Sequence, residues 1–245
     1  MTPSPSSLIS RRNLLRRTAF AGISTALLPT LGLGQESASS SPGCNVGKRP
    51  GNATEALQAL TAGNKRWSTF TQCHPNENAA RRLSVVNGQS PFATILSCSD
   101  SRVPPELLFD QGVGDVFIAR VAGNCADGTL TESLYYGIKD QYLGAYILFV
   151  LGHSDCGAVK AAIASYPNED TFQFAQFIYP AVTQALNMGG DRNDLKTFVP
   201  LVTEQNVILG VQVLRKDPEL EGLQITGGIY DLASSRVHIP KILMP

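Results

Sequence analysis

The distribution of apolar residues along the chain predicts buried strands that alternate with helices. Continuous apolar runs of about 4–8 residues between turn formers are typical of strands that are covered on both faces. A fifth, shorter run follows the fourth closely enough to pair with it in a hairpin. The five expected strands are residues 92–97, 115–122, 146–151, 223–230 and 236–239.

The segments between these strands carry apolar residues at helical spacing. We expect helices over residues 131–142 and 156–164, and a broken helical region over residues 172–216. The breaks are expected at Pro180, Gly189–Gly190 and Pro200. The expected fold is therefore an α/β fold, in which a mostly parallel β-sheet of four strands plus an edge strand is flanked by helices.

Two further helices are expected before the first strand. Residues 54–70 carry apolar side chains at helical spacing, and a second helical stretch is expected from Pro75 to Gly88. Because both precede the alternating core, they form an N-terminal helical arm. Such an arm either covers an edge of the sheet or embraces a second copy of the chain.

The first 52 residues are expected to be a targeting segment and a linker. Residues 10–16 resemble the twin-arginine export signal, and the apolar stretch that follows is short for a membrane span. We expect residues 1–38 to be a signal peptide, residues 39–52 a flexible linker and residues 53–245 a single domain. The expected destination is the periplasm, or the thylakoid lumen in a photosynthetic organism; a basic tail on a membrane anchor is the alternative.

The composition limits the classes of partner. The chain has 245 residues, of which 43% are hydrophobic, which suits one well-buried domain. Its formal net charge is zero, and removal of residues 1–38 leaves 16 basic and 19 acidic residues, a charge of −3. We therefore expect a small-molecule substrate, no nucleic-acid partner and no stable membrane insertion after processing.

Candidate chemistry lies at the ends of two predicted strands. Cys98, Asp100 and Arg102 occupy alternate positions after the first strand, which would place them on one side of the chain. His153 ends the third strand, and Cys156 opens the next helix. Because open α/β sheets bind ligands at the carboxyl ends of their strands, we expect these side chains to meet.

Two thiols and one imidazole are good zinc ligands, and three protein ligands leave the fourth position open, as in catalytic zinc sites. Cys98 and His153 are 55 residues apart, so only the fold can join them. The alternative is that the two cysteines are inert core thiols and His153 an ordinary buried histidine. Asp100 and Arg102 favour the metal site, because the carboxylate can accept a proton from a zinc-bound water while the guanidinium holds it in a bidentate pair.

Three cysteines remain outside this group: Cys44, Cys73 and Cys125. An odd number cannot pair completely within one chain. A Cys73–Cys125 disulfide is one option outside the cytoplasm, and separate thiols are the other.

These motifs together resemble the signature of the β-class carbonic anhydrases. The resemblance spans residues 54–240 and also includes residues 88–91, 109–115, 120–124 and 228–232. It implies Zn²⁺ held by Cys98, His153 and Cys156, with the Asp100–Arg102 pair beside it. Together with the helical arm, it implies a homodimer or a higher even oligomer.

The resemblance also assigns substrate-binding roles to four residues. Gln89 is expected to reach the site from the partner subunit, and Phe117 to line the CO2 pocket. The backbone N–H of Gly157 is expected to bind a bicarbonate oxygen. Tyr136 is expected in the pocket, although two extra residues separate it from His153 compared with the family's motif.

Some family members close the site when an aspartate replaces the water on zinc and bicarbonate fills a side pocket that uses a tryptophan. This chain has Ile95 at the tryptophan position, so we expect the open form. The leading hypothesis is a zinc-dependent carbonate dehydratase, in which zinc-bound hydroxide attacks CO2 to give bicarbonate and a proton. A CS2 or COS hydrolase on the same fold and a non-catalytic zinc or thiol protein are the alternatives.

Overall fold

The computed structural model describes residues 48–168 and 172–244. Within them lies a five-stranded sheet with the strand order β2-β1-β3-β4-β5. The first four strands pair in parallel, and β5 pairs antiparallel with β4. The strands are β1 (Ala93–Cys98), β2 (Val116–Val121), β3 (Ile147–His153), β4 (Ile225–Asp231) and β5 (Arg236–His238), each within two residues of its predicted bounds. The predicted α/β fold is confirmed.

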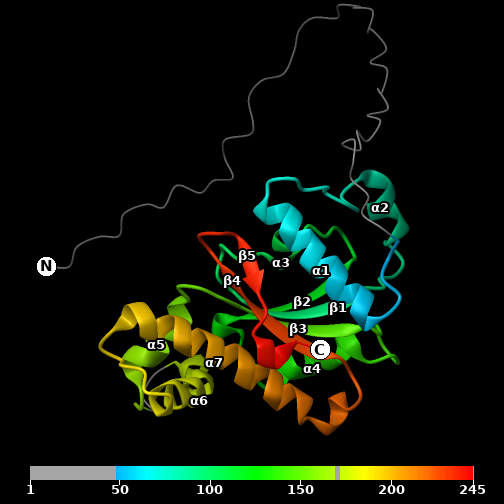
Figure 1. Ribbon diagram of the computed structural model, residues 1–245. Coiled ribbons are helices and arrows are strands. Elements are labelled where there is room, and N and C mark those ends of the chain that lie inside the picture. Colours follow the sequence, from blue (N-terminus) through cyan, green and yellow to red (C-terminus); the bar gives the residue numbers. More distant parts are fainter. Residues whose placement is uncertain (1–47, 169–171, 245) are drawn as a thin grey trace, which may run out of the picture. The chain divides into compact units, whose positions relative to one another are not determined.

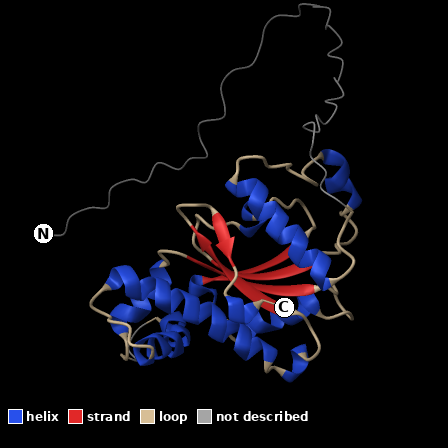
Figure 2. Ribbon diagram, viewed as in Figure 1, coloured by secondary structure: helices blue, strands red, loops and turns tan. Residues whose placement is uncertain are grey.

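Helices cover both faces of this sheet (Figures 1 and 2). They are α1 (Ala53–Ser68), α2 (Ala79–Ser84), α3 (Pro105–Leu108), α4 (Gly128–Ile138), α5 (Gly157–Ser165), α6 (Gln173–Asn187) and α7 (Leu195–Arg215). Short 3-10 segments are η2 (Ala122–Asn124), η3 (Pro218–Leu220) and η4 (Lys241–Leu243). Figure 1 shows α1 across one face of the sheet and α4 and α7 on the opposite face.

Alternating side chains of the strands supply the two halves of the core. Ile95 and Phe149 belong to the cluster that includes Leu60 of α1. Leu96 belongs to the cluster on the other face, which includes Val207 of α7. Because the strands are buried on both faces, they appear in the sequence as continuous apolar runs.

The first helix of the predicted arm packs against its own chain. A Cβ on Gly63 would lie 1.7 Å from the carbonyl oxygen of Phe109, so α1 can approach α3 this closely only with glycine there. The buried amide of Asn64 donates to the carbonyls of Leu108 and Ser235 and accepts from the N–H of Val237. Of the two alternatives for α1, the structure therefore favours covering its own sheet.

Three helical predictions differ from the structure. The stretch predicted from Pro75 to Gly88 forms only the short α2, because His74 and Asn76 adopt positive φ angles that interrupt a helix. Pro180 and Pro200 lie inside α6 and α7 and do not break them. The helix predicted at residues 131–142 begins three residues earlier, where Asp127 caps it, and ends at Ile138.

Among the described residues, α7 is the one helix long and apolar enough to cross a membrane. More than half of its most apolar window is buried, and it packs against β3 and β4. This is the environment of a core helix in a folded domain.

Candidate metal centre

Two adjacent parallel strands and one helix bring the three predicted metal ligands together. Cys98 is the last residue of β1, and His153 is the last residue of β3, which pairs directly with β1. Cys156 is the N-cap residue of α5, three residues beyond His153. The ligand atoms of the three residues all lie within 4.8 Å of one another.

The distances within this cluster suit a tetrahedral zinc ion. The two sulfur atoms are 3.9 Å apart, and both thiols are free. Two Zn–S bonds of about 2.3 Å at a tetrahedral angle would place two sulfur atoms about 3.8 Å apart. Cys98, His153 and Cys156 are 4%, 1% and 1% exposed, so that a bound ion would be largely enclosed by protein.

The imidazole of His153 is oriented for metal binding. Its Nδ1 lies 2.9 Å from the carbonyl oxygen of Ser154, so it carries the proton and donates to that oxygen. The other nitrogen, Nε2, is then an acceptor, and it is buried without a hydrogen-bond partner among the described residues. A buried acceptor without a partner is costly, and a metal ion would satisfy it.

The two thiols differ in acidity. The hydrogen bond from Cys156 lowers the pKa of Cys98, and the bond from the backbone N–H of Gly123 adds to this effect. The same contact with Cys98, together with burial, raises the pKa of Cys156. One thiol of the pair therefore ionises readily while the other retains its proton, which a metal ion would displace.

Asp100 and Arg102 form the predicted bidentate pair. The guanidinium donates from Nε to Oδ1 at 2.9 Å and from Nη2 to Oδ2 at 2.7 Å, and the backbone N–H of Arg102 also donates to Oδ1. These bonds hold the pKa of Asp100 well below its usual range. The carboxylate Oδ2 lies 3.9 Å from His153 Nε2, beside the cluster.

The reason for this pairing differs from the predicted one. β1 ends at Cys98, and residues 101–102 lie in a turn, so strand alternation does not align Asp100 with Arg102. The turn, in which the N–H of Val103 bonds the carbonyl of Asp100, brings the guanidinium back to the carboxylate.

Arg120 on β2 supports the backbone of the candidate site, a role that the sequence did not predict. Its Nε donates to the carbonyl of Cys98 at 2.9 Å, and its Nη2 donates to the carbonyl of Asp100 at 2.6 Å. One side chain thus fixes the backbone at two residues of the site. The motif at residues 120–124, which begins in β2 and continues into η2, was the signal in the sequence. The register that places Arg120 beside Ser97 exists only in the sheet.

The other predicted residues lie apart from the metal cluster of the same chain, except Gly157. Gly157 begins α5 and faces open space, since a Cβ there would meet no atom within 4 Å. Gln89 is exposed and precedes β1, whose length of roughly 16 Å separates it from Cys98. Phe117 lies four residues, or roughly 13 Å, before the residue of β2 that pairs with Cys98.

Tyr136 belongs to an aromatic cluster beside the edge strand β2. Its ring stacks on Tyr142 at 5.4 Å between centroids and lies 6.0 Å from the ring of Phe117. It is 46% exposed. Tyr136 and Phe117 therefore lie together, at a distance from the metal cluster of their own chain.

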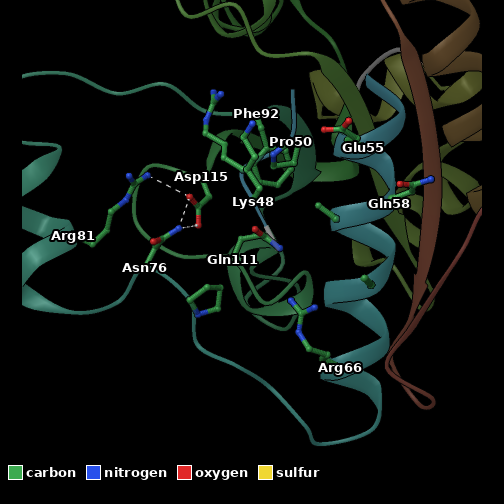
Figure 3. A pocket seen from close by; sticks show the side chains of 14 residues that line it. Lys48, Pro50, Glu55, Gln58, Arg66, Asn76, Arg81, Phe92, Gln111 and Asp115 are labelled. Carbon is green, nitrogen blue, oxygen red and sulfur yellow. Dashed lines mark hydrogen bonds and ion pairs between the residues drawn. The ribbon is translucent and has the colours of Figure 1, made fainter. Parts of the chain in front are cut away.

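A cavity of about 750 Å³ lies elsewhere, between α1 and the segment that carries α2 (Figure 3). Its lining includes four cationic side chains, Lys48, Arg49, Arg66 and Arg81. Three of them are engaged with Ser90, Asp110 and Asp115. None of the candidate metal ligands lines this cavity, so it is separate from the site.

The remaining cysteines match neither of the two options that the sequence left open, a Cys73–Cys125 disulfide or separate thiols. Cys73 is disulfide-bonded, whereas Cys125 is a buried free thiol, so the two do not pair with each other. Burial raises the pKa of Cys125 to about 12, which makes it unreactive at neutral pH. The predictions for Cys44 and for residues 1–38 fall outside the described residues.

Comparison with known proteins gives one consistent family. The family model described as carbonic anhydrase matches residues 93–237. A carbonic anhydrase of Mycolicibacterium smegmatis is 32% identical over 194 residues, which cover 77% of this chain and 93% of the relative. Carbonic anhydrase 2 of Mycobacterium tuberculosis is 40% identical over 114 residues, which cover 46% of this chain and 54% of the relative.

Solved structures share the fold. A β-carbonic anhydrase of Aspergillus fumigatus has a TM-score of 0.59 at 24% identity and covers 77% of this chain and 92% of its own. A β-carbonic anhydrase of Sordaria macrospora, described as tetrameric, has a TM-score of 0.55 at 24% identity. The match covers 77% of this chain and 98% of the Sordaria chain.

Proposed function

Because the chain belongs to the carbonic anhydrase family and has the fold of the β-class enzymes, we propose that it interconverts CO2 and bicarbonate with a zinc ion held by Cys98, His153 and Cys156. One observation carries the assignment of the site. A buried Cys-His-Cys cluster lies beside a carboxylate that Arg102 holds in its ionised form. A structural metal would have no use for that ion pair.

Each residue around the metal has a separate role in the proposed reaction. Zinc, when bound, supplies the Lewis acidity that makes a water molecule nucleophilic near neutral pH. Asp100 accepts a hydrogen bond from that water, because its lowered pKa keeps the carboxylate ionised. Arg102 orients the carboxylate through two side-chain bonds, and Arg120 fixes the backbone of the same segment. The N–H of Gly157, at the start of α5, can donate to a bicarbonate oxygen.

The proposal includes a dimer in which Gln89, and with it Phe117 and Tyr136, serves the site of the partner subunit. Support comes from exposed apolar side chains close to Gln89 in the sequence: Leu83 and Val86 are 75% and 71% exposed. No residue of α2 is buried, so the helix packs against little of its own chain. The three substrate-binding candidates lie far from the metal cluster of their own chain, which is the arrangement that sharing between subunits requires.

The proposal also includes export by the twin-arginine route, on the basis of residues 10–16. The disulfide bond of Cys73 supports an oxidising destination, since disulfides are rare in reducing compartments. Cell fractionation tests this part. The chain should appear outside the cytoplasm, and a double Arg11→Lys, Arg12→Lys variant should remain inside; equal export of both would reject it.

Stopped-flow CO2 hydration by the zinc-loaded protein tests the reaction, with CS2 and COS as competing substrates. We expect hydration of CO2 with weak or no turnover of the sulfur compounds. Turnover of CS2 or COS alone would replace the proposal with the hydrolase alternative. Absence of all three activities from a folded, zinc-loaded protein would leave the non-catalytic alternative.

Metal analysis tests the ligand set separately from activity. We expect one zinc per chain in the wild type and none in a Cys98→Ser, Cys156→Ser double variant. Cys125→Ser is the matched control, because Cys125 is also a buried free thiol but lies outside the cluster. Full zinc occupancy in the double variant would contradict the assignment.

A further inference from the structure

The backbone of Gly123 lies behind the candidate metal ligand Cys98 and is held from two directions. Its N–H donates to Cys98 Sγ, with the nitrogen 3.4 Å from the sulfur. Its carbonyl oxygen accepts from Nδ2 of Asn206 at 2.9 Å and, more weakly, from the thiol of Cys125, whose sulfur is 3.5 Å away. A side chain of α7, 83 residues away in sequence, is thereby connected to a metal-binding sulfur through a single residue.

Gly123 cannot be replaced without losing this geometry. Its φ angle of 73° lies in the left-handed region, which side chains disfavour. A Cβ there would also lie 2.6 Å from Cδ1 of Ile178 on α6. Glycine can adopt this conformation, but it can also adopt many others. A contact from elsewhere in the fold is therefore needed to hold the Gly123 N–H in this direction.

Asn206 supplies that contact from a rigid element. It is 8% exposed, in the middle of the buried face of α7. A buried amide is costly unless it is hydrogen-bonded, and the bond to Gly123 offsets that cost. No motif in the sequence marks Asn206, because its partner is a backbone oxygen on a distant segment.

We propose that Asn206 is a positioning residue for the metal centre: by holding the carbonyl of Gly123, it keeps the Gly123 N–H on the sulfur of Cys98. The inference rests on the proposed zinc site. An N–H bond to a thiolate restricts the orientation of the sulfur and withdraws electron density from it. Hydrogen bonds to metal ligands commonly change metal affinity by about 10–100-fold. Asn206 would therefore strengthen zinc binding and lower the electron density that the Cys98 sulfur donates to the metal, without contacting the metal itself.

The first experiment compares zinc affinity, by competition with a chelator at one pH, for the wild type and Asn206→Leu. We expect the dissociation constant to rise by about 10–100-fold in the variant. Thr203→Val is the matched control, since Thr203 is also buried on α7 and its hydroxyl has no hydrogen-bond partner among the described residues. Its zinc affinity should equal that of the wild type.

A spectroscopic readout separates this role from a general effect on packing. In cobalt-substituted protein, the sulfur-to-metal charge-transfer band should move to longer wavelength in Asn206→Leu, because a sulfur without its N–H donor gives up electron density more easily. Thr203→Val should leave the band in place. Unchanged zinc affinity and an unchanged band in folded Asn206→Leu would overturn the proposal.

Two further measurements keep the test decisive if Asn206→Leu does not fold. Asn206→Ala removes the donor without adding a new polar or bulky group, and it should show the same two effects. In cadmium-113-substituted wild type, the Gly123 amide proton should show scalar coupling to the metal through the sulfur; its absence would also overturn the proposal. A wild type that binds no zinc would instead reject the proposed function.

Discussion

At the scale of single residues, the Asp100–Arg102 pair sets the protonation state of the site. The hydrogen bonds from Arg102 lower the pKa of Asp100 below the usual value for aspartate of about 3.9. A lowered pKa means that the stabilisation by this pair is complete above the usual value and is lost as the pH falls through the lower, folded-state pKa. At neutral pH Asp100 is therefore an acceptor and cannot donate a proton.

Replacing this acceptor should abolish most catalysis while the metal stays bound. In the Asp100→Asn variant, an amide group that cannot take up a proton replaces one carboxylate oxygen, and loss of such an acceptor typically costs about 10²–10⁴-fold in rate. Stopped-flow hydration together with metal analysis measures both effects. Asp155→Asn is the control, because Asp155 also faces Arg102, at 3.7 Å, but is largely exposed and bonded to Lys160. Similar activity in Asp100→Asn and the wild type would contradict the role of Asp100.

The pH dependence of activity should be gradual. Ile95 stands at the position where, by the family resemblance, the bicarbonate side pocket has a tryptophan. Because Asp100 stays ionised and paired with Arg102, activity should fall on acidification with the slope of one proton, as the nucleophilic hydroxide gains a proton and becomes water. A pH–rate profile measures the slope. A steep cooperative loss of activity, with Asp100 bound to the metal in a structure near neutral pH, would show this prediction to be wrong.

At the scale of elements, packing decides where helices form and where they lie. Pro180 and Pro200 each remove a helical N–H, at a cost of about 3 kcal/mol in a helix interior. Both α6 and α7 nevertheless continue, because their buried apolar residues pack on the same core. By contrast, α2 is short and has no buried residue to support a longer helix.

The first helix should contribute strongly to stability. Leu60 is fully buried in the core cluster that includes Phe149 of β3, so Leu60→Ala should lower the free energy of unfolding by about 2–5 kcal/mol. Denaturant unfolding measures the change. Leu195→Ala is the matched control, because Leu195 is 55% exposed and should change stability by less than about 0.5 kcal/mol. Equal effects would mean that α1 is not part of the core in solution.

At the scale of the whole molecule, the chain is expected to be at least a dimer. Light scattering on the wild type should give twice the mass of the mature chain or a higher even multiple. Leu83→Ser should weaken association and lower activity together, because it removes an exposed apolar contact near Gln89 without touching the metal cluster. A fully active monomer would contradict the shared site.

The sequence by itself predicted the alternation of strands and helices and the three residues that the structure brings together as a candidate metal centre. Strands buried on both faces must be continuously apolar, and residues at the ends of adjacent parallel strands must meet. For this reason Cys98, His153 and Cys156 could be placed at one edge of the sheet before any distance was known. These inferences need only local patterns and the general rules of α/β folds.

Only the tertiary structure decided the contacts that link distant segments. Three such contacts depend on strand register and helix packing. They are the hydrogen bond from Asn206 to the Gly123 carbonyl, the hydrogen bond from Arg120 to the Cys98 carbonyl, and the packing of α1 on the sheet through Asn64. It also decided that Cys125 stays free while Cys73 is disulfide-bonded. The physical reason is that such bonds join side chains to backbone atoms or to remote residues, and neither the spacing nor the type of a residue reveals which backbone atom the fold will place beside it.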